Sequence, residues 1–165
     1  MRTKILFATI FFISLTKLQS QNLLFKELLE VKNSNLAYVE EFLTQKNWSL
    51  IESTAPTYEK MGILTFSYEA SSINKAESFI YYMFSNNEKD SNRLSIGISN
   101  KQKYLEYLKE IKTNKGKLTS SYVENEELVK VYTNSIYRFT ITTYSEFTKN
   151  ISETYWQIVI RDIDD

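Results

Sequence analysis

Residues 93–111 read RLSIGISNKQKYLEYLKEI, and the spacing of their apolar residues changes part-way along. Leu94, Ile96 and Ile98 alternate with small or polar residues, and this period of two predicts a half-buried β-strand. Beyond position 103 the apolar residues follow the period of an α-helix instead. The chain is therefore expected to pass directly from a strand into a helix, which indicates a mixed α and β fold.

The helix in this stretch has a start signal and a stop signal. Ser99 and Gln102 have the spacing of a capping box, in which each side chain hydrogen-bonds the backbone N–H of the other residue. Lys115 and Gly116 are expected to end the helix. The predicted buried face consists of Tyr104, Leu105, Leu108 and Ile111.

Seven other segments have strand patterns, and most alternate between apolar and polar residues. Residues 79–84, FIYYMF, differ because they are apolar on both faces, as in a central strand. The tripeptide 124–126 is expected to join two strands as a hairpin. The predicted strands are 48–50, 64–68, 79–84, 118–123, 127–133, 136–144 and 154–162.

Two helices are expected before the first strand. Residues 23–31 form the first one, and the second begins at residue 36 after the polar tripeptide 33–35. Asn35 is the predicted N-cap of the second helix, and Asn47 is expected to end it. The apolar face of the first helix is predicted to consist of Leu24, Leu28 and Val31.

The order of these elements suggests a tandem arrangement. Residues 36–99 and 101–163 each contain a helix followed by four strands. An antiparallel meander presents one apolar face, which the preceding helix can cover. We expect residues 21–165 to form a single α+β domain, an antiparallel sheet with helices on one face. Whether the two units arose by duplication stays open, because sequence identity between them is sparse.

This element order resembles that of the secreted β-lactamase inhibitor protein family, which is built from tandem helix-plus-four-strand units. The resemblance extends over nearly the whole mature chain but includes no residue motif. It implies the fold alone. No inhibitory residue of that family can be assigned to a position in this chain.

The first 20 residues have the layout of a secretory signal peptide. Arg2 and Lys4 precede an almost wholly apolar run, residues 5–15, which is too short to span a bilayer. Cleavage is expected after Ser20, to within two residues. The leader holds three basic residues and no acid, so the mature chain has 17 basic and 20 acidic residues and a net charge of −3.

The mature protein is therefore expected to be exported, either periplasmic or secreted, and not to span a membrane. The absence of cysteine excludes both disulfides and a lipid anchor on cysteine. The leader and the overall composition, rich in Asn, Lys, Ile and Tyr, resemble exported proteins of Bacteroidetes. This is a resemblance of style that identifies no family.

The composition excludes several classes of chemistry. The chain has no histidine and no cysteine, so Ser-His-Asp and Cys-His catalytic sites and ordinary zinc sites are impossible. Its three glycines, at positions 62, 97 and 116, form no phosphate-binding loop. We predict no catalytic residue, no cofactor and no metal. The near-neutral charge also argues against a nucleic-acid partner.

Acidic residues leave two possibilities open. A glycosidase needs only two carboxyl groups, and Glu40–Glu41 and Glu124/Glu126/Glu127 are the densest acidic groups before the C-terminal residues. Their positions favour a solvated helix side and a hairpin tip instead. Asp162, Asp164 and Asp165 could together hold a hard cation, but they match no calcium loop, and an exposed solubilising tail is the preferred interpretation.

Tyrosine and phenylalanine are abundant, with 12 and 10 copies. The strand alternation predicts that Phe66, Phe79, Tyr137, Phe139 and Trp156 point into the core. It places Tyr82, Tyr144 and Tyr155 on the opposite face, where they are the candidate partner-binding residues. Tyrosine suits such a surface because it is apolar at one end and forms hydrogen bonds at the other.

These observations lead to two functional hypotheses. The first is a non-enzymatic binding or interaction module, whose open sheet face contacts an unknown protein or a cell-surface polymer. The alternative is a carboxylate-dependent enzyme that acts on glycans, since that chemistry does not require histidine. A purely structural envelope component cannot be separated from the first hypothesis by sequence.

Overall fold

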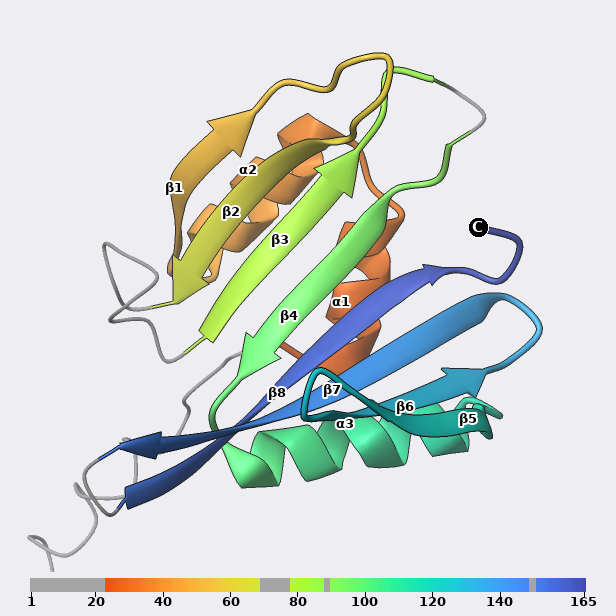
Figure 1. Cartoon of the computed structure of the whole chain (residues 1–165). Helices are drawn as coiled ribbons and strands as arrows, with labels where there is room; N and C mark the ends of the chain where they lie inside the picture. The colour runs from red at the N-terminus through yellow and green to blue at the C-terminus, as the bar shows by residue number, and fades with distance from the viewer. Residues whose placement is uncertain (1–22, 69–77, 88–89, 149–150) are drawn as a thin grey trace, which may run out of the picture.

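The computed structural model describes residues 23–68, 78–87, 90–148 and 151–165. The predicted leader, residues 1–20, lies outside these residues. One antiparallel sheet of eight strands runs through the molecule in the order β1-β2-β3-β4-β8-β7-β6-β5 (Figure 1). The strands are β1 Trp48–Thr54, β2 Gly62–Tyr68, β3 Ser78–Phe84, β4 Arg93–Ile98, β5 Lys117–Glu124, β6 Glu127–Thr133, β7 Tyr137–Thr148 and β8 Ile151–Asp162.

Three helices within the described residues pack on one face of the sheet, so the predicted α+β class with helices on one face is confirmed. They are α1 Phe25–Lys32, α2 Leu36–Gln45 and α3 Lys101–Thr113. In Figure 1, α1 and α2 lie behind β2, β3 and β4, whose other face is turned toward the viewer. We call the helix-covered side the inner sheet face and the other side the outer sheet face. No helix among the described residues is long and apolar enough to cross a membrane.

The inner face carries the core. Phe66 and Phe139 are fully buried, Trp156 is nearly so, and Tyr137 packs against the edge of the core, as predicted. Phe79 was also expected there, but it lies on the outer face, one residue out of phase with buried Ile80. The reason is that β3 is apolar on both faces, so its alternation does not distinguish inside from outside.

Helix capping agrees with the sequence in α2 and differs in α3. The Asn35 side chain accepts a hydrogen bond from the Tyr38 backbone N–H, so the predicted N-cap is confirmed. In α3 the N-cap is Asn100, which accepts from the Lys103 N–H. The predicted capping box at Ser99 is therefore wrong by one residue, because Asn is as good an N-cap as Ser.

The buried faces of α1 and α3 are also rotated from those predicted. Leu24 precedes α1 and is exposed, while Phe25 takes its place in the core. In α3 Tyr107 is fully buried and Leu105 is 42 % exposed. The Tyr107 hydroxyl donates to the backbone carbonyl of Leu23 at 2.8 Å, so this helix turns an aromatic ring with a polar end toward α1.

The last strands of the two predicted units lie side by side at the centre of the sheet. Ile96 of β4 is paired directly with Ile158 of β8, and both are fully buried. Helix α1 packs on both strands. Its Phe25 ring lies 6.1 Å from the Tyr107 ring and 5.8 Å from the Phe139 ring. Buried apolar residues of α1 and of both units therefore belong to one core.

The two edges of the sheet are irregular. Strand β1 shifts register between Leu50 and Glu52, and β5 shifts between Leu118 and Ser120. Such bulges disturb the regular row of backbone groups that would pair with another chain. The predicted hairpin between β5 and β6 is confirmed, and its two turn residues, Asn125 and Glu126, both have positive φ.

Candidate functional site

The three candidate tyrosines do not form one surface. Tyr82 lies on the inner face with 1 % of its side chain exposed, and its hydroxyl donates to the Ser34 carbonyl at 2.6 Å. Burial raises the pKa of Tyr82 to about 12. The prediction that Tyr82 faces outward is therefore wrong, for the same reason as the prediction for Phe79. Tyr82 is a core residue that anchors the turn between α1 and α2.

Tyr144 and Tyr155 do share the outer face. They are directly opposite each other on β7 and β8, and both are half-buried. The Tyr144 hydroxyl donates to Gln157 Oε1 at 2.6 Å, and the Tyr155 hydroxyl donates to the Glu153 carboxylate. The two rings are thus held on the sheet by neighbouring polar groups.

A chain of hydrogen bonds crosses the outer face from β7 to β4. Tyr144 donates to Gln157, whose Nε2 donates in turn to Ser95 Oγ at 2.8 Å. Ser95 is 2 % exposed. Because each group in the chain has a partner, the Gln157 amide is held in one orientation. This chain gives the centre of the outer face a fixed polar floor.

Aromatic rings bound this floor on the side of β3. The Phe79 ring lies directly over Gly97, where a Cβ atom would be only 2.3 Å from it. Glycine is therefore needed at this position for the ring to lie against the sheet. Tyr81 packs edge-on against Phe79, with ring centroids 5.1 Å apart.

Next to the Tyr81 ring, the outer face is hollowed. The hollow has a volume of about 540 Å³, within the range of small-ligand sites, and we call it the outer-face hollow. Its apolar lining comes from Ile63, Tyr81, Met83 and Val159. Its polar lining comes from Arg93, Ser95, Thr140, Gln157 and Arg161.

Neither arginine was singled out from the sequence, although a signal existed. In β4 and β8 the residues that alternate with the buried isoleucines include Arg93, Ser95, Gln157 and Arg161. These four residues share the outward phase of two adjacent strands. Reading that phase as a surface, instead of only counting aromatic residues on it, would have marked these four residues as outward-facing, and the β4–β8 pairing then brings them together.

A second hollow, of about 470 Å³, lies along α3. It is lined by Leu105, Leu108, Lys109, Lys112 and Thr113. All of these residues come from one helix, so the described lining of this hollow brings together no polar groups from separate elements. The outer-face hollow, which combines an apolar lining with polar groups from several strands, is therefore the better candidate for a binding site.

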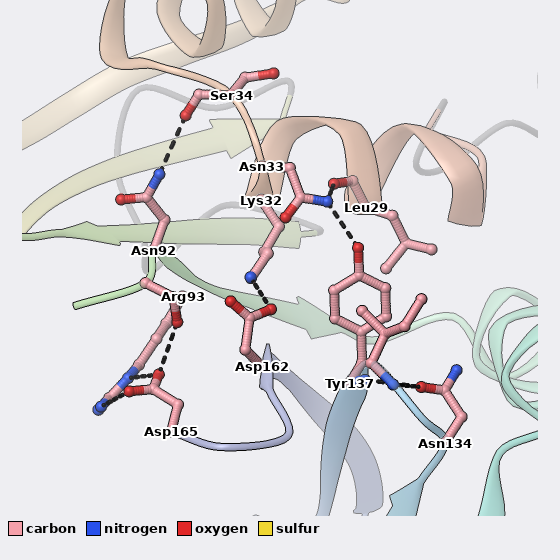
Figure 2. A network of polar contacts seen from close by, with 12 residues as sticks. Leu29, Lys32, Asn33, Ser34, Asn92, Arg93, Asn134, Tyr137, Asp162 and Asp165 are labelled. Atoms are coloured by element: carbon pink, nitrogen blue, oxygen red, sulfur yellow. Dashed lines mark hydrogen bonds and ion pairs between the residues drawn. The ribbon is translucent and has the colours of Figure 1, made fainter. Parts of the chain in front are cut away.

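Polar contacts next to the outer-face hollow join the end of α1 to the last residues of the chain (Figure 2). Lys32, although 2 % exposed, forms an ion pair with Asp162. The Asn33 side-chain amide donates to the Tyr137 hydroxyl at 2.7 Å. These contacts cross from the helix layer to the ends of β7 and β8.

The acidic C-terminal residues are therefore not the exposed tail that was expected. Asp162 is paired with Lys32, and Asp165 is held by Arg93 (Figure 2). Of these three residues, only Asp164 is exposed. The tail interpretation missed the basic partners, because these lie about 70 and 130 residues away in sequence. Among the described residues, no three acidic side chains are grouped so as to hold a metal ion.

The other acidic candidates lie on the surface. Glu40 and Glu41 are exposed on α2, and Glu124 and Glu126 are exposed at the β5–β6 turn, with Glu127 half-buried beside them. No acidic residue of the described parts of the chain lines either hollow. Comparison of the whole chain with protein-family models, with curated proteins and with solved structures gives no match.

Proposed function

We propose that this chain is a non-enzymatic binding protein that is exported and contacts its partner through the outer sheet face. The observation that carries the proposal is the outer-face hollow, in which apolar side chains and two guanidinium groups surround a fixed polar floor. A few oriented polar groups within an apolar hollow are the usual composition of a recognition site.

The arrangement of the elements supports the outer face as the binding surface. The helices cover the inner face, and both sheet edges carry bulges that oppose strand addition. Tyr144 and Tyr155 extend the surface beyond the hollow along β7 and β8. A partner larger than the hollow would contact them as well.

The alternative, a carboxylate-dependent enzyme acting on glycans, has less support. Glycosidase chemistry needs two carboxyl groups on either side of one bond. Among residues 23–68, 78–87, 90–148 and 151–165, no acidic side chain lines the outer-face hollow. Glu40, Glu41, Glu124 and Glu126 are exposed to solvent. A binding role accounts for the residues that line the hollow, and it does not require a catalytic group among them.

Site-specific crosslinking in the producing cells tests the proposal. A photoreactive amino acid at Met83, in the hollow, is expected to give a crosslinked adduct with the partner. The same amino acid at Thr44, exposed on α2 on the other side of the molecule, serves as the matched control. Adducts from position 44 but not from position 83 would contradict an outer-face binding surface.

Export is tested separately by processing. We expect the mature protein to begin within two residues of Gln21 and to be found in the periplasm or the medium. Mass spectrometry of the N-terminal peptide, with cell fractionation, measures both. An unprocessed chain in the cytosol would contradict this part of the proposal.

A further inference from the structure

Three arginines form a row across neighbouring strands of the outer face. Arg138 of β7 is directly opposite Arg161 of β8. The β4–β8 register, which pairs Leu94 with Ile160, brings Arg93 next to Arg161 on the other side. We call Arg93, Arg161 and Arg138 the arginine row. Like charges directly opposite each other destabilise an antiparallel sheet.

The positive charge of this row is only partly balanced. Asp165 pairs with Arg93. Within the described parts of the chain, Arg138 and Arg161 form no ion pair. A row of guanidinium groups, beside a hollow that no described acidic residue lines, is complementary to an anionic partner.

Asp165 shows how the row binds a carboxylate. Its two oxygens accept from Arg93 Nε at 2.8 Å and from Nη2 at 3.0 Å, and Ser91 Oγ donates to it at 3.1 Å. This is the bidentate fork that arginine forms with carboxylates (Figure 2). The hydrogen bonds from Arg93, with the positive charge of Arg161 nearby, lower the pKa of Asp165.

The other end of the hollow is apolar. Met83 is paired with Arg93 across β3 and β4, and Ile63 is paired with Met83 across β2 and β3. The hollow is therefore apolar on β2 and β3 and basic on β4 and β8. Three strand spacings, roughly 14 Å, separate Ile63 from Arg161. An extended peptide covers that distance with about four residues, at roughly 3.4 Å per residue.

We propose that the outer-face hollow and the arginine row at its side bind an acidic peptide segment of another protein, with a carboxylate on Arg161 and Arg138 and an apolar side chain on Ile63 and Met83. This inference rests on the proposed function, because it takes the outer face as the binding surface. An acidic polysaccharide fits less well, since a chain of sugar acids has no aliphatic side chain that could cover Ile63 and Met83. Asp165 is an internal competitor for the same row.

Fluorescence anisotropy with a defined probe tests this assignment. The probe is a labelled peptide, Leu-Ser-Ile-Asp-Asp, whose last three residues copy those at positions 163–165. We expect Arg161→Gln and Arg138→Gln each to weaken binding about tenfold, the effect of losing roughly 1.4 kcal/mol. Asp165→Asn is expected to strengthen binding several-fold, because it frees Arg93. Lys112→Gln on α3 removes an equal charge far from the row and should leave binding unchanged.

The opposite signs of these effects separate recognition from general charge attraction. A peptide with Asn in place of both Asp residues should bind at least tenfold more weakly than the probe. Equal binding of the two peptides, an unchanged affinity of Asp165→Asn, or a loss with Lys112→Gln equal to that with Arg161→Gln would overturn the assignment. Tighter binding of polygalacturonate than of the peptide would also overturn it, in favour of a polysaccharide.

The failure of this inference can be told apart from the failure of the proposed function. If crosslinking from Met83 succeeds while the acidic peptide does not bind, the outer face is a binding surface and the ligand class is wrong. If neither occurs, both proposals fail. Circular dichroism and urea unfolding of each variant show whether a loss of binding reflects a loss of folding.

Discussion

Lys32 is the most deeply buried charged side chain among the described residues, with Asp162 as its ion-pair partner. The partners differ in environment, because the Asp162 side chain is 37 % exposed. Removing one partner of a buried pair is costly when the charge left behind stays buried. We therefore expect Asp162→Asn to lower the free energy of unfolding by about 3 kcal/mol.

Lys32→Met provides the comparison. Methionine fills similar space without a charge, and the remaining Asp162 carboxylate still reaches water, so the loss should be clearly smaller than with Asp162→Asn. Urea unfolding at neutral pH measures both variants. An equal or larger loss with Lys32→Met would mean that the buried ammonium group stabilises the fold by more than its pairing with Asp162.

Asp165 gives the protein a specific acid sensitivity. Its pKa is lowered in the folded state by the hydrogen bond from Arg93, from an ordinary value of 3.8. A lowered pKa stabilises the folded state fully above pH 3.8, and this stabilisation is lost as the pH falls from there through the folded-state value. We expect the melting temperatures of the wild type and Asp165→Asn to differ by a constant amount from pH 5 to 7.

Below pH 3.8 that difference in melting temperature should shrink. Arg93→Gln, which removes the other partner, should show the same plateau and the same decrease on acidification. Differential scanning calorimetry over this pH range is the measurement. A difference that grows on acidification would show that Asp165 is not stabilised by Arg93 in the folded state.

At the scale of elements, the β5–β6 turn holds two non-glycine residues in a backbone conformation that favours glycine. Asn125 and Glu126 both have positive φ, 48° and 68°, in a two-residue hairpin loop. Loops of this kind favour Asn-Gly, because a left-handed conformation costs a non-glycine residue about 1–2 kcal/mol. Glu126→Gly should therefore raise the free energy of unfolding by about 0.5–1 kcal/mol, after the entropic cost of glycine is subtracted.

Glu126→Ala is the matched control, since it removes the same side chain but keeps the Cβ atom. It should leave stability within about 0.5 kcal/mol of the wild type, as for most exposed substitutions. Urea unfolding compares the two variants. If both stabilise equally, the effect comes from removing a negative charge near Glu124 and Glu127 and not from the backbone.

The elements themselves were largely predictable, and their orientation was not. Every predicted strand and helix has a counterpart in the structure, because periodic burial produces a periodic pattern of apolar residues in the sequence. Strand β3 is apolar at six successive positions, so its sequence does not show which residues face the core. Its phase is decided by tertiary packing, in which Tyr82 bonds to Ser34 and Phe79 covers Gly97. The candidate site failed at Tyr82 for this reason.

The arginine row could not be predicted for a different reason. Arg93, Arg138 and Arg161 are separated by 45 and 23 residues in sequence and become neighbours only through the pairing of β4 with β8 and β8 with β7. Strand order is a long-range property that alternation within single strands does not encode. Alternation within a strand therefore predicts which face of the sheet a residue occupies. It does not predict which residues of other strands lie beside it on that face.

At the scale of the whole molecule, the question is whether the two helix-plus-four-strand halves are independent. The central β4–β8 pairing joins them through fully buried residues, among them Ile96 and Ile158. Helix α1 precedes both halves and contacts both, because it packs on β4 and β8 and its Phe25 packs against Tyr107 and Phe139 of the second half. Separating the halves would expose apolar surface on both, at a cost of about 25 cal/mol per Å².

We therefore expect one cooperative unit. Residues 21–99 and 100–165, produced separately, should each lack a cooperative unfolding transition, whereas the full mature chain should unfold in a single step. Mixing the two fragments should restore the transition, because the β4–β8 ladder and the contacts of α1 need no covalent link to form. Calorimetry measures each case, and a fragment that melts cooperatively alone would show that the halves are separate domains whose contact is secondary.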